Sequence, residues 1–282
     1  MGKIFVVDVA KCTGCYNCQL VCKDEHCDND WRPYAAPQPD TGQFWCKLEE
    51  HLRGTTPKVK IHYIARLCGH CDNASCMSAC DVDAITKRDD GLVIIDPDKC
   101  NGCMKCVSAC PYEAIYINKE LNIAQKCTGC AHLLDNGTAL PRCVEACPTD
   151  AMMFGEEEDF ADMIKEATIF NPEAELSPRI YYLNIPGRFI GGTVYDPVIK
   201  EVVIGAKCSL TCVCDCNAGE CDCKNDTIEA ETNDFGDFWF KDLAEEKFSL
   251  TIAADGYEDL VFKDLDTSND INLGDIPMII LP

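Results

Sequence analysis

The sequence contains no apolar run that approaches the roughly 20 residues needed by a membrane-spanning helix, so direct membrane insertion is not expected. Basic residues are scarce: 25 Lys and Arg stand against 48 Asp and Glu, giving a formal net charge of −23. Such an acidic chain is not expected to bind nucleic acid or an anionic membrane. The opening residues, MGKIFVVDVAKC, show no charged segment followed by an apolar one, so we expect no export leader and a cytoplasmic location.

Cysteine, in contrast, is abundant, with 24 residues in a chain of 282. Sixteen of them form four groups of four: Cys12, Cys15, Cys18 and Cys22; Cys68, Cys71, Cys76 and Cys80; Cys100, Cys103, Cys106 and Cys110; and Cys127, Cys130, Cys143 and Cys147. The first and third groups have the C-x2-C-x2-C-x3-C spacing of the bacterial ferredoxin run, whose fourth cysteine ligates the other cluster of a pair. The four groups in tandem predict 4Fe-4S clusters.

Two other uses of cysteine fit the spacing less well. Structural zinc usually takes two C-x2–4-C pairs separated by a longer gap, and an evenly stepped run does not suit one tetrahedral ion. A disulfide scaffold needs an oxidising compartment, which the absence of a leader does not favour. Iron–sulfur ligation is therefore the preferred interpretation of the sixteen cysteines.

Other residues near the groups are interpreted as supporting ones. A lysine directly precedes three of the groups, at Lys11, Lys99 and Lys126, and a cluster with four thiolates needs positive or donor groups nearby. The five histidines are not needed as ligands, because each cluster already has four thiolates. We expect them to be structural or surface residues, with His70 and His132 as candidate hydrogen-bond donors to a cluster sulfur.

Cysteines outside the four groups are interpreted separately. Cys27 and Cys46 lie between the first two groups and are expected to be spare thiols. Near the C-terminal end, C-x-C spacing in a strand would place thiols on one face, and NAGE could turn the chain, so one hypothesis is a site for a soft metal ion. We favour a hairpin of uncoordinated thiols, because this is not a usual zinc spacing. The candidate ligands of that extra site are Cys212, Cys214, Cys216, Cys221 and Cys223.

The order of patterns along the chain predicts an α+β protein. The phrases VDVAKCTGC, IDPDKCNGC and IAQKCTGC repeat a strand, a Lys-Cys turn and a cluster loop, which predicts tandem ferredoxin-like 4Fe-4S units over residues 1–155 with an insertion at 23–67. The segment 156–186 is predicted to hold one amphipathic helix, over 156–169, and a linker. Short alternating strands predict a small all-β antiparallel sandwich of prealbumin or Cna-B type over 187–282.

With these residues in view, the chain resembles the iron–sulfur subunits of the dimethyl sulfoxide reductase family of molybdopterin oxidoreductases. Those subunits carry four cysteine groups in this order, including C-x2-C-x4-C-x3-C and a long gap in the fourth, and the resemblance covers about residues 3–155. The phrases AQKCTGCAHLLD, PRIYYLN, AETNDFGDFWF and LTIAADG are similar to small subunits of transhydroxylases within that family. Related subunits serve enzymes that hydroxylate or dehydroxylate polyhydroxylated aromatics.

The resemblance implies how the sixteen cysteines are shared among four clusters. It assigns Cys12, Cys15, Cys18 and Cys147 to cluster 1; Cys22, Cys127, Cys130 and Cys143 to cluster 2; Cys68, Cys71, Cys76 and Cys110 to cluster 3; and Cys80, Cys100, Cys103 and Cys106 to cluster 4. The chain departs from the family pattern at Asp81, where proline is usual. A carboxylate beside a cluster is expected to lower its potential.

The resemblance also implies the function. We expect an electron-transfer subunit without catalytic residues, in a heterodimer with a large subunit that binds molybdopterin guanine dinucleotide with molybdenum or tungsten. The partner is expected to act anaerobically on polyhydroxylated aromatics, and an external carrier to exchange electrons with the clusters. The alternatives are a free-standing polyferredoxin, or a subunit of another molybdopterin reductase. Export as the passenger of a twin-arginine partner is the alternative to a cytoplasmic location.

Overall fold

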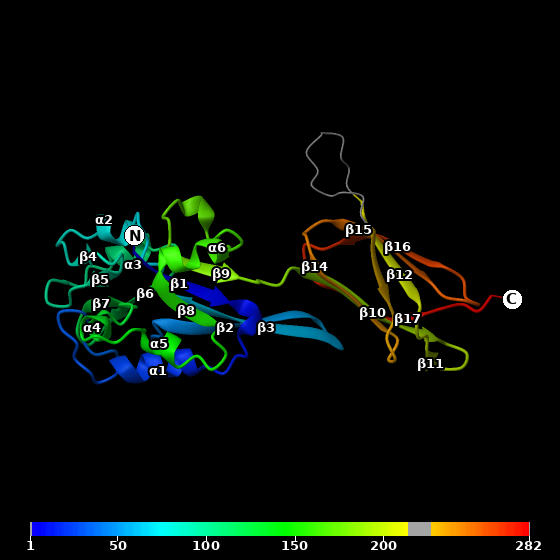
Figure 1. Ribbon diagram of the computed structural model, residues 1–282, viewed down its shortest axis with the longest axis horizontal. Coiled ribbons are helices and arrows are strands. Elements are labelled where there is room, and N and C mark those ends of the chain that lie inside the picture. Colours follow the sequence, from blue (N-terminus) through cyan, green and yellow to red (C-terminus); the bar gives the residue numbers. More distant parts are fainter. Residues whose placement is uncertain (1, 214–226, 282) are drawn as a thin grey trace. The chain divides into compact units, whose positions relative to one another are not determined.

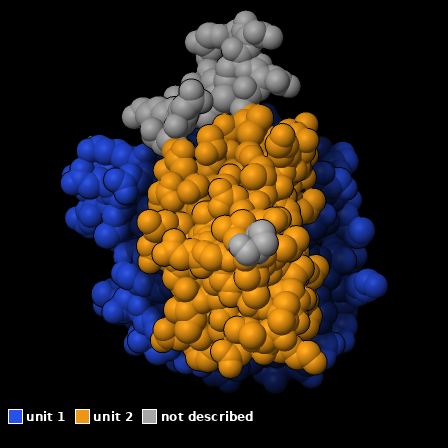
Figure 2. Space-filling model, turned by 90° about the vertical axis from the view of Figure 1, so that its right-hand side faces the viewer, with its two compact units in different colours: residues 1–51, 62–185 blue, residues 52–61, 186–282 orange. Residues whose placement is uncertain are grey.

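The computed structural model describes residues 2–213 and 227–281. The chain divides into two compact units, Met1–His51 with His62–Ile185 and Leu52–Ile61 with Pro186–Pro282 (Figures 1 and 2). In the described ranges, no helix is both long and apolar enough to cross a membrane.

The first unit contains a three-stranded sheet with β1 (Lys3–Asp8) in the middle. β8 (Met152–Glu156) pairs with β1 in the antiparallel sense, and β9 (Ile180–Leu183) pairs with it in the parallel sense. Every residue of β1 after Lys3 is buried, as expected for a central strand covered on both faces. The pairing of β1 with β8 brings the segment after the first strand beside the segment before Met152.

The cysteine groups occupy loops and short helices between small hairpins (Figure 1). The helices are η1 (Val9–Lys11), α1 (Asn17–His26), α2 (Ser75–Ser78), α3 (Lys105–Ala109), α4 (Ala131–Asp135) and α5 (Arg142–Glu145). The hairpins pair β4 (Ile85–Lys87) with β5 (Val93–Ile95), and β6 (Ile115–Asn118) with β7 (Ile123–Lys126), both antiparallel. Strand β6 follows the third cysteine group, and β8 follows the fourth.

The insertion between the first two groups forms a long hairpin of β2 (Cys46–Thr55) and β3 (Lys58–Leu67). Its tip, Leu52–Ile61, belongs to the second unit although the rest of the hairpin belongs to the first. Within the second unit, Arg53 forms an ion pair of 2.6 Å with Asp270, and Lys58 pairs with Asp237. The tip is therefore an integral part of the C-terminal unit.

The amphipathic helix expected over 156–169 is wrong in length. The structure has only η2 (Glu157–Phe160) and α6 (Ala161–Ile164) there, followed by η3 (Pro172–Ala174). β8 continues to Glu156, and Thr168 forms an isolated bridge with Tyr182, so both ends of the segment are held in extended conformation. The linker expected up to residue 186 contains β9, which belongs to the sheet of the first unit.

The C-terminal unit consists of two four-stranded sheets around one apolar core. One sheet contains β10 (Arg188–Asp196), β11 (Glu201–Val202), β14 (Asp237–Leu243) and β17 (Ile271–Pro277). The other contains β12 (Lys207–Cys212), β13 (Thr227–Glu231), β15 (Lys247–Ala253) and β16 (Leu260–Asp266). Alternate residues of β12 and β15 are buried, as a sheet with one face on a core requires.

The expectation of a wholly antiparallel arrangement is wrong at one pair. β17 runs parallel to β10, with Ile190 opposite Ile271 and Val194 opposite Ile276. β17 follows β16 of the other sheet, so it reaches β10 by crossing between the sheets and not through a hairpin, and this connection allows the parallel sense.

Candidate iron–sulfur sites

The first set of thiols combines the loop after β1 with the loop before β8. Cys147 lies near Cys12, because β1 and β8 pair, and Cys15 and Cys18 also lie near Cys12. Burial raises the pKa of the Cys12 thiol, the N–H of Gly14 opposes that rise, and the sulfurs of the other three cysteines add to it. We call Cys12, Cys15, Cys18 and Cys147 the first set.

The second set centres on Cys22, which lies in α1 and is buried. Burial raises the pKa of its thiol well above the ordinary value, and the sulfurs of Cys127, Cys143 and Cys130 raise it further. These four cysteines come from α1, from the loop after β7 and from α5. They form the second set.

The third set joins the second cysteine group to the last cysteine of the third. Burial raises the pKa of the Cys71 thiol to about 12, and the sulfurs of Cys68, Cys76 and Cys110 add to the rise. These four form the third set.

The fourth set lines a single cavity. Cys80, Cys100, Cys103 and Cys106 all contribute to its wall. Burial raises the pKa of the Cys106 thiol to about 11, and Cys100 and Cys103 add to the rise. The structure therefore brings together all four predicted groups of ligands, while the assignment of iron to them stays a proposal.

The chemistry of these sets fits 4Fe-4S clusters. Sulfurs crowded in buried positions repel one another as thiolates, and bound metal removes that penalty because it deprotonates and pairs with the thiols. Among the residues that the structure describes, no group of three or more His, Cys, Asp or Glu side chains is arranged to hold a single metal ion. A cluster differs from such an ion because each thiolate binds a different iron.

Backbone N–H groups donate to ligand sulfurs in the second, third and fourth sets. His70 N donates to Cys68 Sγ at 3.4 Å, and Gly129 N donates to Cys127 Sγ at 3.3 Å. In the fourth set, Ala84 N donates to Cys80 Sγ and Ala124 N to Cys100 Sγ, both at 3.3 Å. Such bonds stabilise the negative charge of ligand sulfurs and tune cluster potentials.

Comparison with known proteins identifies the family. Residues 59–157 match a family described as a 4Fe-4S dicluster domain. The pyrogallol hydroxytransferase small subunit of Pelobacter acidigallici is 37% identical to this chain, over 92% of the chain and 94% of the relative. The chain belongs to the iron–sulfur subunits of the molybdopterin oxidoreductases.

Two further relatives of this iron–sulfur subunit cover less of it. A tetrathionate reductase subunit of Salmonella typhimurium is 35% identical over 66% of the chain and 73% of the relative. A putative iron–sulfur subunit of dimethyl sulfoxide reductase in Halobacterium salinarum is 32% identical over 65% of the chain and 80% of the relative. The expected family is confirmed, and the chain is an electron-transfer subunit that contains a 4Fe-4S domain.

The four sets of this iron–sulfur subunit follow one another in series. The third and fourth sets are neighbours, because the charges of Cys106 and Cys76 affect each other. The second and third sets are neighbours through Cys127 and Cys68. The first and second sets meet at a single additional residue, Cys46, described next.

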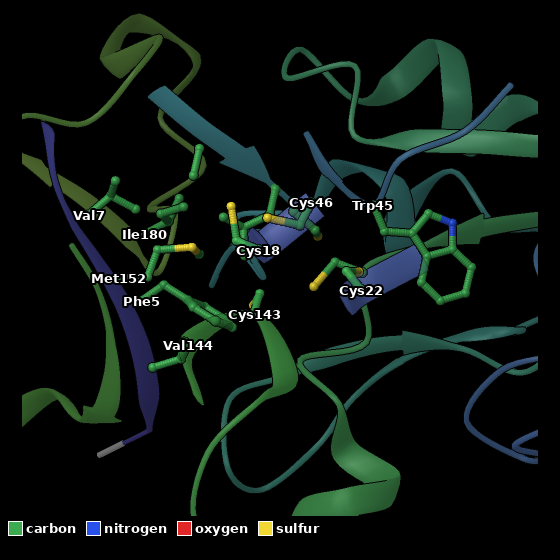
Figure 3. Close-up of a cluster of buried hydrophobic side chains, with 14 of the residues drawn as sticks. Phe5, Val7, Cys18, Cys22, Trp45, Cys46, Cys143, Val144, Met152 and Ile180 are labelled. Carbon is green, nitrogen blue, oxygen red and sulfur yellow. The ribbon is translucent and has the colours of Figure 1, made fainter. Parts of the chain in front are cut away.

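Cys46 was not predicted to have a role, yet it lies between two sets (Figure 3). It is buried at the start of β2, its thiol is within hydrogen-bonding reach of Cys143 and Cys18, and its backbone N–H donates to Cys22. Hydrogen bonding with Cys143 and Cys18, followed by burial, raises the pKa of the Cys46 thiol well above the ordinary value, which keeps it a donor. Nothing in its sequence context indicates this, because it lies outside every C-x2-C run.

Each of the two candidate histidine donors has one ring nitrogen bonded to other groups. His70 Nδ1 accepts from Val93 N at 2.9 Å, and its backbone N–H reaches a ligand sulfur. His132 Nε2 lies 3.0 Å from Glu25 Oε1, and its ring stacks on Trp31. The other ring nitrogens, His70 Nε2 and His132 Nδ1, are buried with no hydrogen-bond partner among the described residues, so donation from them to a cluster sulfur stays a prediction.

The remaining predictions concern Asp81 and the candidate ligands of the extra metal site. Asp81 forms an exposed ion pair with Lys105, which offsets the carboxylate charge expected to lower a cluster potential. Cys212 lies at the end of β12, opposite Phe248 of β15. The other candidate ligands of the extra metal site lie outside the described residues: Cys214, Cys216, Cys221 and Cys223.

Proposed function

We propose that this subunit carries four 4Fe-4S clusters in two tandem ferredoxin-like units, and that it relays electrons between a molybdopterin site in a separate large subunit and an external carrier. The observation that supports this is the presence of four sets of four thiols, each drawn from at least two separate segments of the chain, in series along the first unit. When bound, such a cluster accepts and returns an electron.

The residues of this chain hold, shield and tune the clusters and perform no substrate chemistry. Cysteines of the second set are buried in the main core of the first unit, which keeps water from the middle of the series. Cys15 and Cys103 are exposed, so the first and fourth sets have members at the surface. Surface exposure at the two ends of the series is the arrangement an electron relay needs, because electrons must enter at one end and leave at the other.

We further propose that the partner binds molybdopterin guanine dinucleotide with molybdenum or tungsten and adds, removes or moves hydroxyl groups on polyhydroxylated aromatics. The support is the match to the pyrogallol hydroxytransferase small subunit, which extends over 92% of the chain and thus into the C-terminal unit. A role in another molybdopterin reductase is the second candidate, favoured by the match to the tetrathionate reductase subunit over 66% of the chain.

Anaerobic affinity purification of the tagged chain from its native host tests the relay. We expect a large second subunit, about 16 iron per chain and one molybdenum or tungsten. The complex is then assayed on trihydroxybenzenes and on tetrathionate, which separates the two candidate partners. Purification of the chain alone, with iron but no pterin metal, would contradict the relay and support a free-standing polyferredoxin. Cell fractionation of the same culture tests the proposed cytoplasmic location against export with a partner.

Single substitutions test the number of clusters. Cys15→Ser, Cys130→Ser, Cys71→Ser and Cys103→Ser each remove one ligand from a different set, and each is expected to remove or convert one cluster signal in electron paramagnetic resonance. Cys208→Ser is the matched control, because Cys208 is buried in the core of the C-terminal unit. If one substitution abolished two signals, or one of the four abolished none, the proposed count would be wrong.

A further inference from the structure

Three lysines directly precede a cysteine group, and only one of them is buried. The side chains of Lys11 and Lys99 are 52% and 58% exposed and form ion pairs with Asp8 and Asp96. Lys126 is the last residue of β7, is 2% exposed and ranks among the largest fully buried side chains. The same sequence context therefore produces two surface cations and one interior cation.

The ammonium of Lys126 has only neutral oxygens as hydrogen-bond acceptors. Its Nζ donates to Val93 O, and to Cys127 O at 3.0 Å. Within residues 2–213 and 227–281, no carboxylate forms an ion pair with it. Burying a charge without a counter-charge is strongly unfavourable. We therefore expect a negative group near Lys126 that is not one of its hydrogen-bond acceptors.

The position of Lys126 connects it to ligands of two different sets. It directly precedes Cys127 of the second set, and its Nζ donates to Val93, whose N–H bonds His70, the residue that donates its own backbone N–H to Cys68 Sγ of the third set. Burial raises the pKa of the Cys76 thiol to about 11, and the charge of Lys126 opposes that rise. Burial likewise raises the pKa of Cys110, and that of Cys127 to about 12, and in both cases Lys126 again opposes the rise. Cys76 and Cys110 belong to the third set and Cys127 to the second, so one ammonium faces both.

A neighbouring histidine does not share this role. His70 is buried, and burial, followed by the positive charge of Lys126, holds the pKa of its ring well below the ordinary value. His70 Nδ1 lies 2.9 Å from Val93 N and 3.1 Å from Val93 O, so this ring nitrogen is bonded to the backbone of β5. Lys87, the other cation that acts on His70, forms its own ion pair with Asp72. Of the two cations that act on His70, Lys126 is the one without a carboxylate partner among the described residues.

We propose that Lys126 is a shared counter-ion for the second and third clusters, placed at the junction of the two ferredoxin-like units, where it stabilises the electron on whichever of the two clusters holds it. The inference rests on the proposed four-cluster relay. Transfer of one electron across the junction oxidises one cluster and reduces the other. A fixed positive charge stabilises the reduced form of both clusters, so it raises both potentials.

The test replaces Lys126 by methionine, which keeps an unbranched side chain of similar length without the charge. In potentiometric titrations of the purified complex, followed by electron paramagnetic resonance, Lys126→Met is expected to shift the midpoint potentials of clusters 2 and 3 downwards and to leave clusters 1 and 4 unchanged. The signals are assigned with Cys130→Ser and Cys71→Ser. Lys126→Arg, which keeps the charge, is expected to restore most of the shift. Lys99→Met is the matched control, because this lysine also precedes a group but is exposed.

The outcomes separate the inference from the function on which it rests. Four clusters with unmoved potentials in Lys126→Met, or a shift confined to one cluster, would overturn the role of Lys126 and leave the relay intact. A wild-type complex with fewer than four clusters would instead contradict the relay. If Lys126→Met does not incorporate iron, iron in Lys126→Arg supports a requirement for charge, and loss of iron from both variants overturns it in favour of a requirement for shape.

Discussion

The thiol of Cys46 lies within hydrogen-bonding reach of Cys18 and Cys143, which are predicted ligands of two different clusters, although Cys46 belongs to no cysteine group. We predict that Cys46→Ala keeps the full iron content, because each set already has four thiols. Removal of its S–H donor is expected to lower the potentials of clusters 1 and 2, since hydrogen bonds to ligand sulfurs raise them. Iron analysis and redox titration check both parts.

The matched control is Cys27→Ala. Cys27 also lies in the insertion, but its thiol contacts Gln38 O at 3.6 Å and Asp40 Oδ1 at 3.4 Å, and no predicted ligand. We expect that variant to leave all potentials unchanged. Loss of about four iron atoms from Cys46→Ala would show that Cys46 is a ligand and that one of the sixteen assignments is wrong.

At this scale, spacing along the chain identified the sixteen cysteines as ligands but not the neighbours that surround them. Their division among four clusters followed from the resemblance to the family and not from the spacing. The roles of Cys46 and Lys126 could not be predicted, because they depend on where β2 and β7 lie relative to distant loops. Lys11 and Lys126 have the same immediate context, Lys-Cys-Thr-Gly-Cys, and only the burial of β7 separates them.

Among the elements, the first cluster loop depends on a close approach at Gly14. This residue has a φ of +70°, and an added Cβ would lie 2.5 Å from the ring of Tyr63. We predict that Gly14→Ala costs about 3 kcal/mol, the sum of a left-handed conformation and overpacking. Because the loop carries Cys12 and Cys15, the variant is also expected to lose cluster 1, as measured by iron content and electron paramagnetic resonance.

Gly42→Ala is the control for the close approach. Gly42 has a φ of +87° but nothing within 4 Å of an added Cβ. Its cost is expected to be about 1 kcal/mol, from the backbone conformation alone, with all clusters retained. Equal behaviour of the two variants would show that contact with Tyr63 is unimportant.

The hairpin tip, Leu52–Ile61, is anchored in the C-terminal unit by a buried ion pair. Arg53 and Asp270 have side chains only 11% and 5% exposed. Burial alone would raise the pKa of Asp270, but bonds from Arg53 and from the N–H of Phe189 bring it below its ordinary value. Because the folded pKa lies below the unfolded one, this contribution to stability is present above the ordinary pKa of 3.8 and is lost as pH falls below it.

We therefore predict that Arg53→Met costs about 3 kcal/mol at neutral pH, because it leaves an uncompensated buried carboxylate. Asp270→Asn is expected to make the stability of this unit less dependent on pH below about 4. Urea titration with hydrogen exchange of the β17 peptide measures both effects. Arg188→Met, which removes an ion pair to the exposed Glu245, should cost less than about 1 kcal/mol. A similar loss in both arginine variants would contradict the anchoring role.

Elements with a strong local pattern could be predicted, and those decided by pairing could not. The repeated phrase of a strand followed by a Lys-Cys turn predicted strands before three of the cluster loops, and these correspond to β1, β5 and β7. The periodicity over 156–169 predicted a helix that strand pairing at Thr168 shortens. Nothing in the hairpin sequence indicates that its tip belongs to the other unit, because the partners of Arg53 lie more than a hundred residues away.

At the scale of the whole molecule, the two units have cores of different composition. The core clusters of the first unit include eight predicted ligands: Cys18, Cys22, Cys68, Cys71, Cys76, Cys106, Cys127 and Cys143. The core of the C-terminal unit contains apolar side chains from both sheets, with Cys208 as its only fully buried cysteine among the described residues. We therefore expect the interior of the first unit to depend on bound metal and the described core of the second to be stable without it.

We predict that anaerobic removal of iron from the purified protein unfolds the first unit and leaves the second folded. Buried thiols that lose their metal repel one another or must be protonated inside the core, so the free energy of metal binding is also free energy of folding. In hydrogen exchange, peptides of β1 and α1 should lose protection, while peptides of β10, β14 and β17 keep it. The tip 52–61 should behave like the C-terminal unit, although the cysteine groups flank it in the sequence. Reconstitution with iron and sulfide should restore protection to the first unit alone. Loss of protection in both units at once, or in neither, would show that the two cores do not differ in their dependence on metal.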